Sequence, residues 1–157
     1  MDQLSDLTSP THLPFATIAI RLAAALVFGA MIGIEREWRK HPAGLRTHML
    51  TALAACLFTL LAGEFLQSQS FPDDLVRSDP IRVIEAVTSG VAFLAAGAII
   101  QSRGGVRGLT TGAGMWLSGA LGVAAGLGEL RLGFLAAALG VVILLVLREV
   151  EVAFEKK

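Results

Sequence analysis

Residues 29–47, GAMIGIEREWRKHPAGLRT, join an apolar segment rich in small residues to a dense run of charge. The apolar segment stops abruptly at Glu35, and the short sequence Ala-Gly-Leu-Arg-Thr at 43–47 leads into a second apolar run. This order predicts a tight, charged hairpin between two membrane helices. So many charged residues beside a bilayer either anchor the topology of the protein or form a functional surface. The charged side chains are Glu35, Arg36, Glu37, Arg39 and Lys40.

Composition extends this prediction to the whole chain. Apolar residues make up 54% of the 157 residues, charged residues make up only 17%, and the charged ones are clustered. Five apolar runs approach the roughly 20 residues that a helix needs to cross a bilayer, and none alternates like a β-barrel strand. We therefore expect an all-α, polytopic transmembrane bundle of about five spanning helices, at about 15–34, 48–66, 81–101, 109–128 and 131–147.

The distribution of lysine and arginine predicts the orientation of this bundle. With five spans, nine of the 13 basic residues fall on one face, and the other four lie at or near the opposite border. Because basic residues are enriched on the cytoplasmic side, we expect an extracytoplasmic segment at 1–14 and a short charged cytoplasmic tail at 148–157. Topology accounts for the basic residues, so the lipid bilayer, and no nucleic acid, is the partner that composition implies.

The sequence carries no pattern that indicates an enzyme. HExxH, P-loop, GxSxG and dinucleotide-binding motifs are absent, so we expect neither enzymatic activity nor an organic cofactor. Cys56 is the single cysteine and lies in the middle of a span, which favours a small packing residue. His41 and His48 are expected at the cytoplasmic interface.

Small residues recur at intervals of four along the apolar runs. This spacing lets helix backbones approach closely, which is how helices associate in lipid. We expect these residues either to pack the bundle internally or to form a homodimer face, and both alternatives remain open. The glycines assigned to helix packing are Gly29, Gly33, Gly90, Gly97, Gly122 and Gly126.

The third apolar run opens with ionisable residues. Asp79 precedes Pro80, which fits an N-cap followed by proline at the first helical position, so capping is the simplest role for Asp79. Ionisable groups within a membrane segment are costly and indicate a functional site, although a structural ion-pair network is an equal alternative. The functional hypothesis is a proton or cation site, including Mg²⁺, which one or two carboxylates hold together with water. The predicted outer polar cluster is Asp79, Arg82, Glu85, Glu64 and Arg21.

A second polar cluster is predicted on the cytoplasmic side. Glu35 and Arg39 have the i, i+4 spacing of a helical ion pair, and arginines from two other loops approach them. Thr110 and Thr111 open the fourth helix, where their hydroxyls are able to cap free backbone N–H groups. These features suit either anchoring and capping or a site for an anion or an acidic peptide. The predicted inner polar cluster is Glu35, Arg36, Arg46, Arg107, Thr110 and Thr111.

A series of motifs runs through residues 20–130 in an order that is more specific than any single motif. The motifs are Gly33–Arg36, Ala43–His48, Asp79–Arg82, Ser89–Leu94, Gly97–Ile100, Val106–Thr111 and Trp116. Together they resemble the MgtC/SapB family of bacterial inner-membrane proteins. Ala95 stands where the family usually has glycine, and Gly-Ala-Gly at 112–114 replaces a commoner Ala-Ala-Ser, so the residues stay small. Longer members of the family carry a soluble C-terminal domain, and we expect this chain to be a short form without it.

The resemblance implies a multi-pass protein of the bacterial inner membrane, tied to growth in low Mg²⁺, to acid stress or to survival inside host cells. It favours a membrane regulator that binds a partner within the bilayer, with machines such as the ATP synthase among the partners it suggests. The alternative is a dimeric transporter or channel that moves Mg²⁺ or another small cation or solute past Asp79 and Glu85. The resemblance also strengthens the roles predicted for five residues: Asp79, Arg82, Glu35, Arg36 and Arg46.

Overall fold

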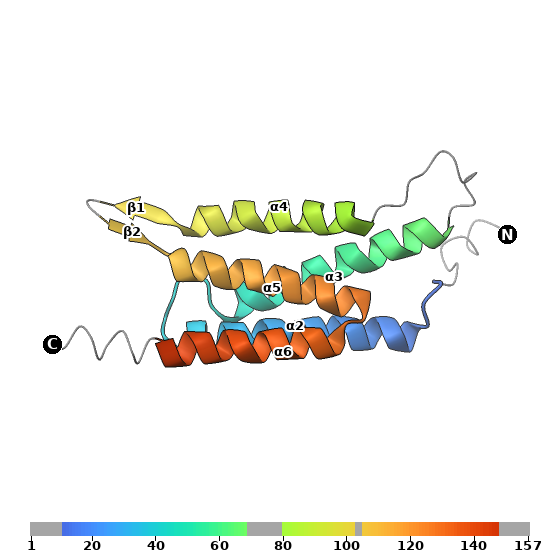
Figure 1. Ribbon diagram of the computed structural model, residues 1–157, viewed down its shortest axis with the longest axis horizontal. Helices are drawn as coiled ribbons and strands as arrows, with labels where there is room; N and C mark the ends of the chain where they lie inside the picture. Colours follow the sequence, from blue (N-terminus) through green and yellow to red (C-terminus); the bar gives the residue numbers. More distant parts are fainter. Residues whose placement is uncertain (1–10, 69–79, 103–104, 148–157) are drawn as a thin grey trace.

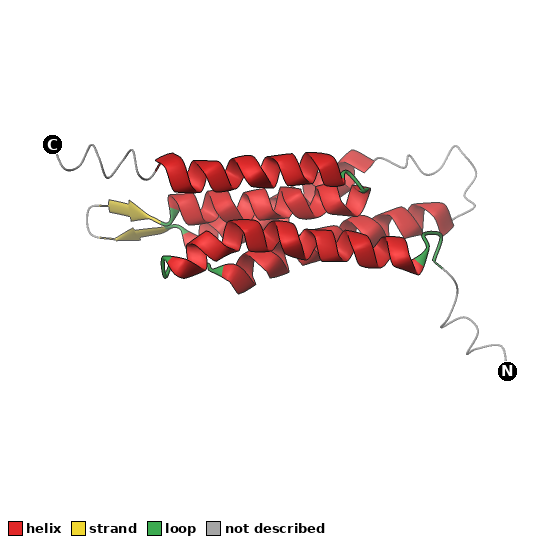
Figure 2. Ribbon diagram, turned by 90° about the horizontal axis from the view of Figure 1, so that it is seen from below, coloured by secondary structure: helices red, strands yellow, loops and turns green. Residues whose placement is uncertain are grey.

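A computed structural model describes residues 11–68, 80–102 and 105–147, and these residues form five helices and one short β-hairpin (Figure 1). The helices lie side by side along the long axis, and the hairpin projects from one end of the bundle, here called the hairpin end (Figure 2). The helices are α2 (Phe15–Trp38), α3 (Leu45–Ser68), α4 (Pro80–Ala98), α5 (Leu109–Leu127) and α6 (Leu130–Val142), which continues as a π-helical turn over Ile143–Leu147. The predicted all-α class with five helices is confirmed.

Two boundaries differ from the expected ranges for clear physical reasons. The first helix continues beyond residue 34 to Trp38, because the charged residues that follow pair with each other and need not leave the helix. The third helix ends at Ala98, short of the expected 101, and the chain forms strands β1 (Ile100–Ser102) and β2 (Gly105–Arg107). The strands are antiparallel, with Ile100 opposite Arg107. Glycines are frequent in this segment. Because glycine disfavours a helix interior and suits a tight connection, the chain changes here from a helix to two short strands.

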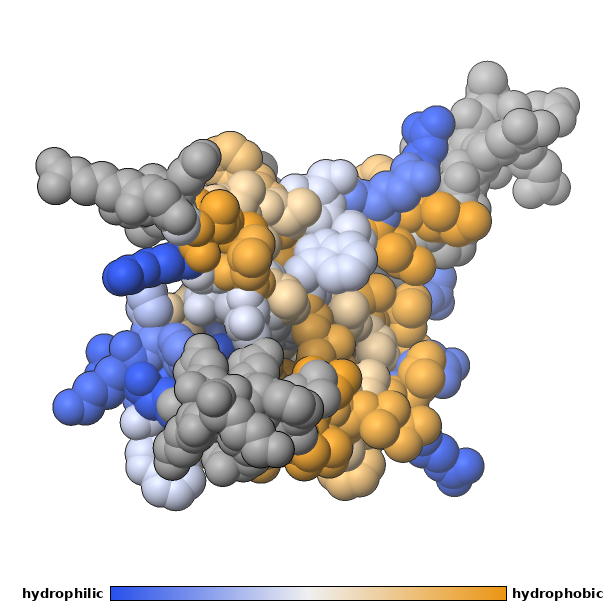
Figure 3. Space-filling view, turned by 60° about the vertical axis from the view of Figure 1, so that its left-hand side comes forward, coloured by the Kyte–Doolittle hydropathy of each residue, from blue (hydrophilic) through white to orange (hydrophobic). Residues whose placement is uncertain are grey.

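The outside of the bundle is apolar. Phe15, Phe93 and Trp38 are each more than 80% exposed, and apolar side chains cover the flank in Figure 3, with hydrophilic ones towards the ends. A flank this apolar indicates a lipid environment, because soluble monomers rarely expose so large an apolar surface. By length and composition, three helices qualify as membrane spans: α2, α3 and α4. α5 is rich in glycine and threonine, and the apolar stretch of α6, Leu130–Val146, is shorter.

Helix α5 lies at the centre and contacts each of the other four helices. α3 packs closely against both α2 and α5, whereas α4 packs mainly along α5 and only lightly against α3. The main apolar core joins α2, α3, α5 and α6, with fully buried Ile32, Cys56 and Leu121 among its members. α4 therefore stands at the edge of a tightly packed group of helices.

Glycines close the interfaces with α3. A Cβ added to Gly29 would lie 2.7 Å from the carbonyl oxygen of His48, and one added to Gly33 would lie 2.8 Å from the Cα of Leu45. On α5, added Cβ atoms at Gly122 and Gly126 would likewise meet residues of α3. Gly90 and Gly97, both on α4, have nothing within 4 Å of such an atom among the described residues. The first four glycines thus serve packing within the chain, and the two on α4 face open space.

Candidate functional site

The most concentrated charge lies where α2 reaches the hairpin end. Glu35 and Arg36 are only 5% and 4% exposed, and Arg36 Nε donates a hydrogen bond to Glu35 Oε2 at 2.5 Å. Arg39 forms a second ion pair with Glu35, through Oε1, without the alignment of a hydrogen bond. A buried charge is tolerated only when it is paired. One carboxylate between two guanidiniums leaves this group of three side chains with a net positive charge.

The turn after α2 is fixed by a second carboxylate. Glu37 Oε2 accepts a hydrogen bond from the backbone N–H of Leu45 at 3.0 Å, in the first turn of α3. Gly44 lies so close to Glu37 that a Cβ on it would overlap the carboxylate. Lys40 adopts φ 57°, a left-handed conformation that reverses the chain. The predicted tight, charged connection between the two helices is therefore built by Glu37, Lys40 and Gly44 together.

His48 is completely buried one turn into α3. Its Nδ1 lies 2.8 Å from the carbonyl oxygen of Gly44. Because a carbonyl only accepts, Nδ1 carries the proton and Nε2 is left as an acceptor. A Cβ added to Gly114 on α5 would lie 3.0 Å from Nε2, and Nε2 has no hydrogen-bond partner among the described residues.

Ser118 follows Gly114 by one turn of α5 and is also completely buried. Its hydroxyl likewise has no hydrogen-bond partner within the described ranges. The next small residue on the same face, Gly122, meets Ala52 and Ala55 of α3. Ser118 therefore lies in the α3–α5 interface between the levels of His48 and Ala52. The sequence patterns did not bring His48 and Ser118 together; the available signal was the spacing of four between the small residues Gly114, Ser118 and Gly122.

The remaining members of the predicted inner cluster lie at the same end of the bundle. Arg46 is exposed in the first turn of α3, Arg107 is exposed on β2, and Thr110 is exposed at the start of α5, whereas Thr111 is buried. The N-cap of α5 is Gly108, in a left-handed conformation, and no side chain caps it. The threonines thus do not take the capping role expected for them. In the part of the chain described, no ion pair connects Arg46 or Arg107 with Glu35.

At the opposite end, two members of the predicted outer cluster hold the backbone. The carboxylate of Glu64 accepts hydrogen bonds from the backbone N–H groups of His12, at 2.7 Å, and Leu13, at 3.0 Å. Arg21 Nη1 donates to the carbonyl oxygen of Gly126 at 2.7 Å, and so satisfies the C-terminal end of α5. Glu64 and Arg21 therefore tie the entry of α2 and the exit of α5 to the bundle.

The other members of the outer cluster stand apart from these contacts. Arg82 and Glu85 are exposed in the first turns of α4 and form no ion pair with any described residue. Asp79 lies outside the described residues. Within the described ranges, no group of three or more His, Cys, Asp or Glu side chains is arranged to hold a metal ion. Both oxygens of Glu64 already accept backbone hydrogen bonds, which makes this carboxylate a poor ligand for Mg²⁺.

One histidine outside the helices responds to the charge at the hairpin end. Burial lowers the pKa of His41 from its ordinary value of 6.5, and the nearby Arg36 guanidinium lowers it further. The neutral imidazole is therefore the form that the folded protein favours.

Comparisons with known proteins identify relatives of this chain. A model of the MgtC family matches residues 22–153. Among curated relatives, Protein MgtC of Salmonella typhimurium is 40% identical over 112 residues, which cover 71% of this chain and 44% of that protein. Protein MgtC of Brucella abortus is 40% identical over 117 residues, or 73% of this chain and 44% of the relative.

An uncharacterised protein of Haemophilus influenzae is 35% identical over 126 residues, which cover 80% of this chain and 52% of that protein. The chain thus spans about half the length of the curated relatives that it matches. No solved structure matches it. The match over residues 22–153, together with the helical bundle, establishes that the chain belongs to the MgtC family.

Proposed function

We propose that this protein is a regulator of Mg²⁺ homeostasis and stress adaptation in the bacterial inner membrane, and that it acts by binding a helix of another membrane protein within the bilayer. The single observation that carries this proposal is the unpartnered face of α4. Ser89, Phe93 and Gly97 follow one another at intervals of four, and all three are exposed. Ser89 and Gly97 are small and leave room for a second helix to approach closely in lipid, with the larger Phe93 between them.

The contrast with the other glycines supports the proposal. Gly29, Gly33, Gly122 and Gly126 are already occupied by α3. Gly97 has no neighbour within 4 Å among the described residues, and Phe93 beside it is 81% exposed. The face therefore combines a place for close backbone approach with an aromatic side chain that a partner is able to cover.

The interior of the bundle also favours binding over conduction. Among the described residues, the buried charged side chains are Glu35 and Arg36, and both lie at the hairpin end. Deeper in the bundle, the α3–α5 interface is closed by direct contacts at Gly122 and Gly126. A transport pathway uses ionisable groups or broken helices near the middle of the membrane. The buried polar atoms without a partner between α3 and α5 in the described part of the chain, on His48 and Ser118, are enclosed by these contacts.

A flux assay separates regulation from transport. Purified protein in proteoliposomes is expected to give no Mg²⁺ flux above that of empty vesicles. Saturable flux that is lost in Asp79→Asn would overturn the proposal and establish the alternative, a carrier or channel that uses the outer cluster. Inserted, folded protein is verified in each preparation before flux is compared.

A growth assay tests the α4 face directly. In a deletion strain grown at low Mg²⁺, Gly97→Leu is expected to lose the activity that the wild-type gene restores. Gly63→Leu is the matched control, because Gly63 on α3 also has no described atom within 4 Å of an added Cβ. Equal growth of the two variants at equal membrane levels would overturn the role of this face.

The homodimer expected from the sequence stays a prediction, and disulfide cross-linking tests it. Ser89→Cys places a thiol on the α4 face, while the native Cys56 is buried and does not compete. Our proposal expects no cross-linked band of twice the mass in native membranes. Such a band would make a second copy, and not a different protein, the occupant of this face.

A further inference from the structure

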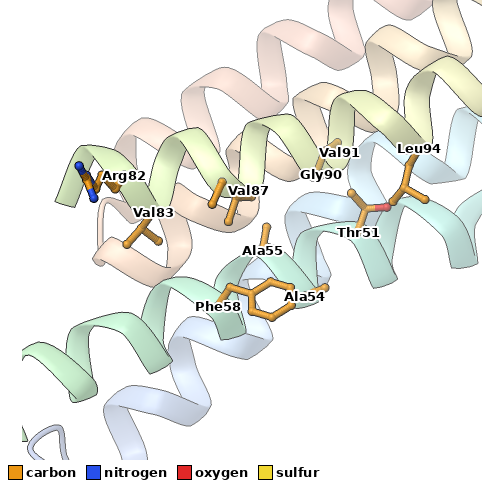
Figure 4. A pocket seen from close by; sticks show the side chains of 11 residues that line it. Thr51, Ala54, Ala55, Phe58, Arg82, Val83, Val87, Gly90, Val91 and Leu94 are labelled. Carbon is orange, nitrogen blue, oxygen red and sulfur yellow. The ribbon is translucent and has the colours of Figure 1, made fainter. Parts of the chain in front are cut away.

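A cleft of about 590 Å³ runs between α3 and α4 (Figure 4). It forms because α4 packs mainly along α5 and only lightly against α3. Small residues on both of its walls widen it: Ala54 and Ala55 on α3, and Ala86 and Gly90 on α4. The cleft is distinct from the α4 face proposed for partner binding, since Ser89, Phe93 and Gly97 do not line it.

The walls of the cleft are apolar along its length, and its charge is at one end. Figure 4 shows Arg82 at one end and Leu94 towards the other. Arg82 is the charged residue in the lining. Thr51 also lines the cleft, and its hydroxyl donates a hydrogen bond to the carbonyl oxygen of Thr47 at 2.8 Å. This hydroxyl is therefore not free to donate a hydrogen bond to a ligand. The cleft therefore suits a ligand with a long apolar part and one anionic group.

The dimensions distinguish a lipid chain from a helix. From Arg82 to Leu94 the cleft follows 12 residues of α4, or about 18 Å at 1.5 Å per residue, close to the ~15 Å of one leaflet in a hydrocarbon core of about 30 Å. A helix is about 10 Å in diameter, which is wide for a cleft between two helices that touch each other, even lightly. An acyl chain is thin enough to enter.

No described acidic side chain pairs with Arg82, so its guanidinium is available to an anion. Arg82 is exposed and has no ion pair with the described residues. Glu85 does not line the cleft, and both oxygens of Glu64 accept backbone hydrogen bonds. Arg21 is held by the carbonyl of Gly126. An arginine at the border of a span reaches readily to the headgroup level.

We propose that the α3–α4 cleft binds one anionic phospholipid, with an acyl chain between the two helices and the phosphate on Arg82. This binding is independent of the proposed function, because it uses the cleft and not the exposed α4 face. A lipid in this position fills the space that α4 leaves against α3, and it fixes the distance between the two helices.

The headgroup contact is tested by native mass spectrometry of the purified protein. The probes are phosphatidylglycerol and phosphatidylcholine with the same palmitoyl and oleoyl chains. Wild-type protein is expected to bind one phosphatidylglycerol more tightly than phosphatidylcholine. Arg82→Gln is expected to weaken phosphatidylglycerol binding about fivefold, the factor given by about 1 kcal/mol per basic residue near an anionic surface. Arg131→Gln is the matched control, since Arg131 is exposed at the same end of the bundle and lines no part of the cleft.

The chain contact is tested by filling the cleft. Gly90→Leu and Gly97→Leu each add a side chain where no described residue lies within 4 Å of the new Cβ, but of the two only Gly90 lines the cleft. Gly90→Leu is expected to lose the bound lipid and Gly97→Leu to retain it. Ala54→Leu fills the cleft from α3 and replaces Gly90→Leu if that variant does not fold. Equal affinities for the two lipids, equal effects of the two arginine variants, or lipid retained by a folded cleft-filling variant would each overturn the proposal.

Discussion

Gly29→Ala adds a single methyl group at a close contact between α2 and α3. The new Cβ would lie 2.7 Å from the carbonyl oxygen of His48, 2.8 Å from the Cα of Met49 and 3.0 Å from the carbonyl carbon of His48. All three atoms belong to the backbone of α3, so no side chain is able to rotate out of the way. The helices themselves must separate.

The size of the effect follows from these distances. Carbon and oxygen atoms in close CH···O contacts lie about 3.3 Å apart, so α2 and α3 must move apart by roughly 0.6 Å at this level. A gap of about 0.5–1 Å removes a quarter to a half of the van der Waals attraction across it. Overpacking of this kind costs about 1–3 kcal/mol. For a chain of this size, that lowers the melting temperature by roughly 2–12 °C.

Thermal unfolding of the detergent-purified protein measures this shift. Gly97→Ala is the matched control: it is the same substitution in a helix of the same bundle, with no atom of the described ranges within 4 Å of the added one. Because alanine favours a helix more than glycine does, the control is expected to melt at or above the wild-type temperature. If the two variants melt together, then the close approach of α2 and α3 does not stabilise the bundle and the reasoning fails.

Three further perturbations test other parts of the structure. Glu35→Gln leaves the buried Arg36 guanidinium without its anionic partner, and we expect a loss of about 3–5 kcal/mol in chemical denaturation; an unchanged midpoint would contradict the buried ion pair. Ser118→Ala removes a buried hydroxyl that has no hydrogen-bond partner among the described residues, so stability should stay the same or rise by about 1 kcal/mol, and a clear loss would contradict this description. The lowered pKa of His41 means that its contribution to stability is complete above pH 6.5 and falls as the pH drops through the lowered pKa. Melting temperatures between pH 5 and 8 should therefore fall less steeply on acidification in His41→Gln than in wild type, and identical slopes would refute the assignment.

The helices were predictable because lipid imposes a simple rule on them. A run of about 20 apolar residues has few options other than a helix in a bilayer, and all five runs form helices here. The hairpin at Ile100–Arg107 was not predicted, because isoleucine and valine are as apolar in a strand as in a helix. Only the glycines between them indicated a break, and they do not specify which structure follows it.

The sites were less predictable, because their contacts join residues far apart in the sequence. Glu64 holds backbone groups 51 and 52 positions away, and Arg21 holds one 105 positions away. In the sequence, Glu64 and Arg21 stand out only as charges at the same depth as other charges. Side chains of opposite charge are the partners that a sequence pattern indicates, so the two were grouped with those charges. Backbone N–H and C=O groups at the ends of helices offer a charged side chain the same electrostatic stabilisation. Because every residue has such backbone groups, the sequence does not reveal which of them a charged side chain binds.

The way in which each helix is held explains why α4 carries both proposals. In lipid no hydrophobic force brings helices together, so close packing must do so. α2 and α5 meet α3 through glycines, and at Gly29 and Gly33 the atoms opposite are mainly backbone atoms that cannot yield. α4 meets α5 through both kinds of atom: a Cβ on Gly119 would lie 2.8 Å from a methyl group of the Val91 side chain, and one on Gly112 would lie 3.2 Å from the carbonyl oxygen of Ala95. A side chain is able to adjust where a backbone is not. α4 packs only lightly against α3, so a lipid in the cleft between them or a partner helix on the exposed face of α4 acts on a helix that α3 does not hold closely.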